Sequence, residues 1–136
     1  MRRADKIVAA ARGMIGVPFR LHGRNGAHGL DCIGLVALAL ERGGHTGLGG
    51  DIVPVAHSVR GGTVARFAVA MQAAGLRRVR KARAGDLVLA QASVAQFHLM
   101  IFTGAGHVHA DAGLGRVVEM PGPPPWPVVA HFRWGR

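Results

Sequence analysis

The sequence predicts an α+β domain in which helices come first along the chain and a small antiparallel sheet follows. Apolar residues recur at helical spacing in the first half, whereas short β-prone runs between Gly, Pro and Asp turns fill the second half. A single cysteine excludes an intramolecular disulfide and a cysteine-based zinc cluster. We expect one domain over residues 1–136, because this length is typical of one domain and sufficient for a hydrophobic core.

Three helices are predicted. Residues 3–14 carry apolar side chains at helical spacing with basic residues between them, and residues 32–42 are apolar on almost every side, as in a central buried helix. Thr63 is a cap for a third helix that extends to about residue 74. Residues 43–62 are rich in glycine and have no period, which predicts a surface excursion that borders a cleft.

The strands are expected to form an antiparallel meander with the helices packed on one side of the sheet. The predicted strands are residues 76–82, 86–92, 97–103, 106–110, 116–120 and 128–134. The turn at Gly85 and Asp86 is interpreted as structural, since it begins a core strand. Residues 17–29 are expected to form an irregular loop, and residues 121–127 a rigid proline-rich connector.

The formal charge of +10 is large for this length and favours contact with polyanions. The sequence has no basic helix interleaved with aromatic residues and no nucleic-acid motif, so we expect no specific nucleic-acid partner. Charged residues interrupt the N-terminal segment, and no apolar run approaches bilayer length. These features predict synthesis in the cytoplasm without a signal peptide, and no membrane span.

Cys32 is the first candidate for chemistry. It follows Asp31, which can cap a helix, and it precedes the apolar run of the second predicted helix. Unpaired N–H groups and the helix dipole favour a thiolate at this position, as in a nucleophile. The alternative is a cysteine that serves as a small buried apolar residue.

Two histidines are candidates for a base and its partner. His98 begins one apolar strand, and His109 lies in the next strand after a tight glycine turn. Adjacent antiparallel strands can bring the two rings together on one face of the sheet. If the helix of Cys32 packs against that face, a Cys–His–His row becomes feasible.

Five motifs in order resemble the NlpC/P60 cell-wall peptidases, a branch of the papain-like cysteine peptidases. After the first helix, the motifs are Ile15-Gly16-Val17-Pro18-Phe19-Arg20, Gly29-Leu30-Asp31-Cys32-Ile33-Gly34-Leu35-Val36, Ala84-Gly85-Asp86-Leu87-Val88-Leu89, His98-Leu99-Met100-Ile101-Phe102 and Val108-His109-Ala110. The resemblance covers roughly residues 5–120. It implies a papain-like fold, with Cys32 as nucleophile, His98 as base and His109 as the residue that orients His98.

The resemblance has two departures near the predicted nucleophile. The family usually has Tyr where this chain has Phe19, and the chain contains no Tyr, so a hydroxyl that helps hold the site or the oxyanion is absent. His22 or a backbone N–H near Cys32 is a candidate replacement donor. Ile33 stands where many relatives carry Ser, and its side chain can point into the core. Asp31 is interpreted as a helix cap, with a contact to the site as the alternative.

The resemblance implies an endopeptidase that cleaves peptidoglycan stem peptides, usually between D-glutamate and the diamino acid, without a cofactor. In its small size and its missing export signal, the chain most resembles the family members that are encoded with phage or gene-transfer-agent tail genes. This predicts tail or baseplate proteins as partners, and a tail-borne enzyme that acts in the cell wall or periplasm.

Two other functions are open. His107, His109 and Asp111 begin a His-x-His-x-Asp pattern of a metal-dependent hydrolase, although Ala112 stands where that pattern needs a further His. The second alternative is a basic structural or adaptor module of a tail assembly, with weak or no catalysis. The high positive charge and the absent Tyr fit this alternative, whereas the presence of Cys32, His98 and His109 together does not.

Overall fold

A computed structural model describes residues 2–45, 62–94 and 96–135. The helices are α1 (Arg3–Gly13), α2 (Cys32–Arg42) and α4 (Val64–Ala73), and they agree with the three predicted segments. Thr63 caps α4, since its hydroxyl accepts a hydrogen bond from Arg66 N–H. Most of the predicted excursion at residues 43–62 lies outside the described residues. Within the described part, no helix is both long and apolar enough to span a bilayer.

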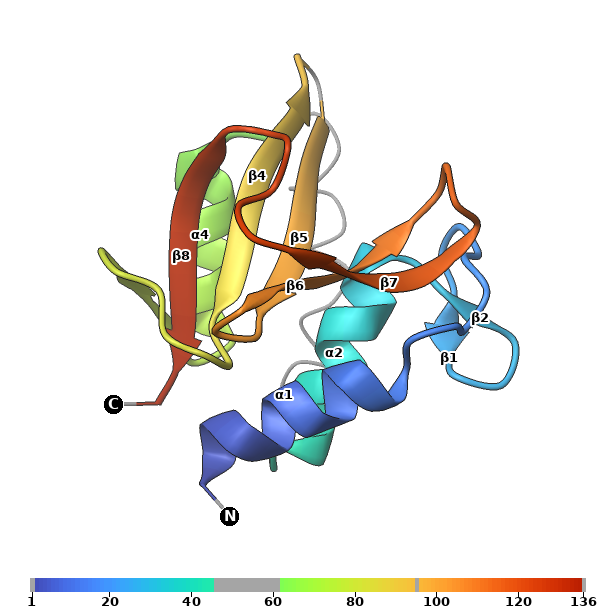
Figure 1. Cartoon of the computed structure of the whole chain (residues 1–136). Coiled ribbons are helices and arrows are strands. Elements are labelled where there is room, and N and C mark those ends of the chain that lie inside the picture. Colours follow the sequence, from blue (N-terminus) through green and yellow to red (C-terminus); the bar gives the residue numbers. More distant parts are fainter. Residues whose placement is uncertain (1, 46–61, 95, 136) are drawn as a thin grey trace.

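All six predicted strands are present, with small differences at their ends. They are β3 (Leu76–Val79), β4 (Leu87–Ser93), β5 (Gln96–Phe102), β6 (Gly106–Asp111), β7 (Arg116–Pro121) and β8 (Val128–Trp134). They form one antiparallel sheet in the order β3-β8-β4-β5-β6-β7 (Figure 1). The predicted meander is therefore correct for β4 to β7 and wrong for β8, which returns to lie between β3 and β4. Side-chain alternation indicates which face of a strand is buried, but it does not indicate which strand lies beside it.

The predicted loop at residues 17–29 contains one short regular element. Strands β1 (Arg24–Asn25) and β2 (Gly29–Leu30) pair as a hairpin, whose turn is held by Ala27 N–H donating to the Asn25 side chain. Strands of two residues are too short to leave a period in the sequence, so the prediction of an irregular loop missed them.

The helices cover one face of the sheet, as predicted. The main core combines buried residues of all three helices with Leu87, Leu89, Leu99, Ile101 and Val108 of the strands. A smaller cluster of Val88, Ala90 and Met100 lies on the opposite face and contains no helix residue within the described ranges. In Figure 1, α4 lies behind β8 and β4. The arrangement is an α+β fold with helices on one layer, as the sequence predicts.

The turn before β4 has the structural role predicted for it. Gly85 adopts a φ of +95°, and a Cβ there would lie 2.9 Å from the Cα of Ala4 in α1. Asp86 is almost fully buried and accepts two hydrogen bonds of 2.8 Å from the Arg133 guanidinium. The turn thereby joins α1, β4 and β8 at one end of the molecule.

Candidate active site

Cys32 is the first residue of α2, as the sequence predicts, and Asp31 caps the helix. The Oδ1 atom of Asp31 accepts a 2.9 Å hydrogen bond from Gly34 N–H. The same atom accepts a 2.7 Å bond from the Arg24 guanidinium, while Oδ2 accepts a 3.0 Å bond from His22 N–H. One buried carboxylate therefore fixes both the start of the helix and the hairpin loop that precedes it.

A close backbone contact holds this loop against the helix. A Cβ on Gly34 would overlap the carbonyl oxygen of Gly23, so only glycine allows the approach. Asp31 N–H donates to the same carbonyl at 3.3 Å. The start of α2 and the preceding loop thus form one rigid unit around Cys32.

Strands β5 and β6 separate beside this unit. Their pairing includes only Ile101 with Val108 and Phe102 with His107, and β6 diverges from β5 beyond it (Figure 1). Phe102 N–H donates toward β4, to Asp86, so alternation directs Leu99 N–H toward the side of β6. This N–H is directed at the Cys32 thiol and lowers its pKa, so it favours the charged form of the sulfur. The sulfur therefore lies beside Leu99, the residue that follows His98 in β5.

The rings of His98 and His109 meet on the sheet, as predicted. His98 Nε2 lies 2.9 Å from His109 Nδ1, and the ring planes are almost perpendicular at 89°. The expectation that the helix of Cys32 packs against the same face is wrong, because α2 packs against the face of Leu99 and Val108. Alternation along β5 and β6 puts the two histidines on the opposite face. The thiol can approach His98 because the strands separate there.

Sequence reasoning missed Trp126. Its indole contacts His98 edge-on with 5.0 Å between ring centroids, and His109 with 5.7 Å. It also packs against the smaller apolar cluster. Trp126 lies in the proline-rich connector, which has no period that assigns a face to its side chains. The sequence feature that could have identified Trp126 is its rarity, since the chain has two Trp and no Tyr.

Burial disfavours the charged forms of the thiol and of both imidazoles in the resting site. Burial raises the pKa of Cys32 to about 11 although the residue is only half-buried, and the Asp31 charge adds to this effect. Hydrogen bonds from Leu99 and Ile33 and the Arg24 charge oppose it. Burial lowers the pKa of His98 to about 4 and also lowers that of His109. The expectation that the helix start favours a thiolate is therefore corrected, because desolvation outweighs it.

No hydrogen bond joins the Cys32 thiol to the His98 ring among the described residues. Catalytic hydrogen bonds are often long before substrate binds, so this geometry is compatible with proton transfer. The backbone N–H of Cys32 likewise donates no hydrogen bond within that part of the chain. It is therefore available to a substrate oxygen.

The remaining predicted site residues surround this centre at different depths. Phe19 is half-buried against the core, and its bridge to Leu30 sets it beside the segment before Cys32. His22 is exposed, with a left-handed φ of 61°, and is tied to Asp31 through its backbone. Ile33, also predicted to lie in the substrate or oxyanion region, has its side chain buried in the core, where the sequence allows it to point.

The alternative metal site lacks support in the described structure. His107 Nδ1 lies 3.1 Å from the Gly122 carbonyl, and His109 Nδ1 is engaged with His98. Asp111 accepts a hydrogen bond from Leu114 N–H in the turn that follows β6. Across residues 2–45, 62–94 and 96–135, no three His, Cys, Asp or Glu side chains lie close enough to hold a metal ion.

Comparison with solved structures identifies the fold. The chain is similar to NlpC1 from Trichomonas vaginalis, with a TM-score of 0.70, 16% identity and coverage of 98% of this chain and 44% of that protein. It is similar to the P60 domain of an antigen from M. avium subspecies paratuberculosis, with a TM-score of 0.61, 21% identity and coverage of 97% and 93%. The NlpC/P60 domain of the peptidoglycan hydrolase SagA gives a TM-score of 0.52, 25% identity and coverage of 87% and 88%.

These likenesses show that the chain has the papain-like NlpC/P60 fold, with Cys32 at the start of its helix. The chain spans less than half of the Trichomonas protein and most of the other two domains. No protein-family model and no curated protein sequence matches it.

Proposed function

We propose that the chain is a cysteine endopeptidase that hydrolyses peptidoglycan stem peptides. The observation that carries this proposal is a cluster of three residues. The Cys32 thiol lies beside Leu99, which is the neighbour of His98 in β5, and Nε2 of His98 is bonded to His109. The likeness to the NlpC/P60 domain of a peptidoglycan hydrolase supports the choice of substrate. The resemblance of the motifs supports the bond between D-glutamate and the diamino acid as the target.

His98 is assigned the proton transfers. A proton on His98 Nε2 that is donated to His109 Nδ1 leaves His98 Nδ1 as an acceptor. As Sγ of Cys32 bonds to the peptide carbonyl carbon, its proton passes to this nitrogen. His98 then gives the proton to the departing amine as the C–N bond breaks. Water next attacks the thioester, with His98 as base, and releases the acid and the thiol.

The oxyanion requires a donor that is not a tyrosine hydroxyl. We assign this role to the backbone N–H of Cys32, at the positive end of α2. His22 is the second candidate, since its backbone is fixed to Asp31 beside Cys32. Phe19 supplies an apolar wall without a hydrogen bond.

A phage-like tail is the proposed means of delivery. This part of the proposal rests only on the sequence-based expectation of a tail-associated member. Co-purification with tail or baseplate proteins is the direct test, and a chain that binds none of them contradicts it.

A non-catalytic adaptor module is the second candidate. The raised pKa of Cys32 favours it, because very little thiolate is present near neutral pH in the resting site. The two candidates differ in one measurable property: the peptidase should cleave a wall peptide, and the adaptor module should not.

Cleavage of a synthetic stem peptide tests the proposal. New amine release should require Cys32 and His98, so Cys32→Ala and His98→Ala should lower the rate by at least about 10³-fold. His28→Ala, which changes an exposed histidine, should retain the activity of the wild type. Equal amine release by wild type and Cys32→Ala contradicts the proposal. Loss of activity with a chelator would instead favour the metal alternative.

A further inference from the structure

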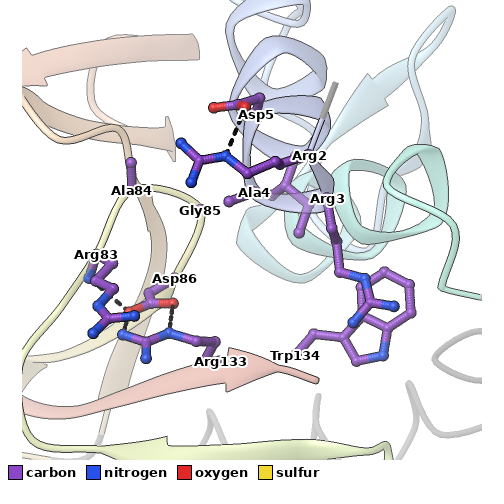
Figure 2. Close-up of a pocket in the computed structure, with 11 residues that line it drawn as sticks. Arg2, Arg3, Ala4, Asp5, Arg83, Ala84, Gly85, Asp86, Arg133 and Trp134 are labelled. Atoms are coloured by element: carbon purple, nitrogen blue, oxygen red, sulfur yellow. Dashed lines mark hydrogen bonds and ion pairs between the residues drawn. The ribbon is translucent and has the colours of Figure 1, made fainter. Parts of the chain in front are cut away.

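A hollow lies at the end of the molecule where α1 begins, β4 begins and β8 ends (Figure 2). Its volume is about 390 Å³, and we call it the arginine pocket after four of its lining residues, Arg2, Arg3, Arg83 and Arg133. Phe102, in β5, forms backbone hydrogen bonds with Gly85 and Asp86, which line the pocket. His98 lies four residues further along β5, or about 13 Å at 3.3 Å per residue. The pocket is therefore separate from the candidate active site.

The arginine pocket carries excess positive charge. Its two carboxylates are Asp86, which binds Arg133 through both oxygens, and Asp5, which lies 3.6 Å from Arg2. Among the described residues, no carboxylate pairs with the guanidinium of Arg3 or Arg83. The pocket thus keeps two more cations than anions.

Two of the guanidinium groups are held in fixed positions. Arg3 lies over the Trp134 ring, with 3.8 Å from its central carbon to the ring centroid (Figure 2). Arg133 is fixed by Asp86 and by the Lys81 carbonyl. A guanidinium held on a ring, as that of Arg3 is, matches the paired oxygens of a phosphate better than a flexible lysine does. Two nitrogens of Arg133 are already bonded to Asp86, so Arg133 shapes the pocket and leaves the phosphate to the other arginines.

The basic surface continues along the neighbouring edge strand. Arg77 of β3 pairs directly with Arg133 of β8 across the ladder and is exposed. Repeated cations along a surface favour a chain of phosphates over a single anion. The occupant that fits this charge distribution is a linear polyanion.

The aromatic residue in the pocket argues against nucleic acid. Proteins that bind single strands offer open aromatic faces on which bases stack. Arg3 covers one face of Trp134, His45 contacts its ring edge-on at 4.8 Å, and the rest of the side chain packs on the main core. The pocket therefore offers donors for phosphate without an aromatic face for a base.

We propose that the arginine pocket binds a linear phosphodiester polymer without nucleobases, of the poly(glycerol phosphate) kind. This goes beyond the proposed peptidase activity and requires no catalysis. The pocket would hold the protein on a phosphate-rich surface while the active site, at a distance, remains open.

Binding of short poly(glycerol phosphate) chains at several salt concentrations tests this inference. The double substitution Arg3→Gln with Arg83→Gln should weaken binding by roughly 10-fold and reduce the slope of log K against log salt by about 1–2. Arg42→Gln with Arg66→Gln removes the same charge from exposed helix positions and should change binding less than about 2-fold. Unchanged circular dichroism would verify the fold of both variants.

Equal weakening by the two double variants would overturn the proposal, because it would assign binding to net charge alone. An oligonucleotide with the same number of phosphates should bind more weakly than poly(glycerol phosphate). Tighter, pocket-dependent binding of the oligonucleotide would overturn the assignment to a base-free polymer. Cys32→Ala should bind like the wild type, so a failure of the peptidase proposal and a failure of this one are distinguishable.

Discussion

Iodoacetamide should react with Cys32 more slowly in the folded protein than in the unfolded chain. With a pKa of about 11, the thiol is ionised in about one molecule in 10⁴ at pH 7, against about 3% for an ordinary thiol near pKa 8.5. This lowers the thiolate population by roughly 300-fold. The greater nucleophilicity of a more basic thiolate recovers about 10- to 20-fold. The net expectation is a native rate roughly 20-fold below that of the unfolded chain.

Mass spectrometry after timed alkylation measures this rate without ambiguity, because the chain has one cysteine. The native rate should rise about tenfold per pH unit from pH 6 to 10, whereas the rate in urea should level off above about pH 9. Asp31→Asn should raise the native rate at pH 7, since the Asp31 charge raises the pKa of Cys32 and Asn keeps a capping oxygen. A native rate that is fast and constant between pH 5 and 7 would refute the reasoning, because it would reveal a resting thiolate paired with an imidazolium.

The other predictions concern the neighbours of the thiol. Because burial lowers the pKa of His98 to about 4, the unfolded chain binds more protons below pH 6.5, so stability should fall by about 2 kcal/mol from pH 7 to 4.5. In urea unfolding, His98→Gln should lose about 2 kcal/mol less stability than the wild type over this pH range. The same pH dependence in both proteins would contradict the assignment to His98. Trp126→Ala should expose His98 and raise its pKa in NMR titrations, with a smaller rise for Trp126→Phe; no rise would show that other residues desolvate the ring. Gly34→Ala should cost about 2–3 kcal/mol by colliding with the Gly23 carbonyl, whereas Gly13→Ala, with nothing within 4 Å, should cost nothing in thermal melts. Equal melting temperatures for these two variants would contradict the contact.

The elements of secondary structure were predictable because their signals are local. Asp31 before an apolar run and Gly43 after it define α2, and alternating residues between turns define the strands. The position of β8 was not predictable, since the alternation in Val128–Trp134 is compatible with pairing to any neighbour. Its place follows from long-range contacts, such as those of Phe132 in the main core and Arg133 on Asp86.

The candidate site divides in the same way. The sequence by itself determined the residue types, namely a cysteine at a capped helix start and two histidines on adjacent strands. Only the tertiary structure decided that β5 and β6 separate beside Cys32, that the histidines lie on the face away from α2, and that Trp126 covers them.

The tertiary structure also decided the protonation of the site. The start of a helix favours a thiolate, and that preference can be predicted from the residues near Cys32. The desolvation that raises the pKa of Cys32 comes from burial of the sulfur in the folded chain. The identities of the candidate reactive atoms are therefore a property of the sequence. Their charges are a property of the packing, because solvent exclusion requires segments distant in the chain to meet.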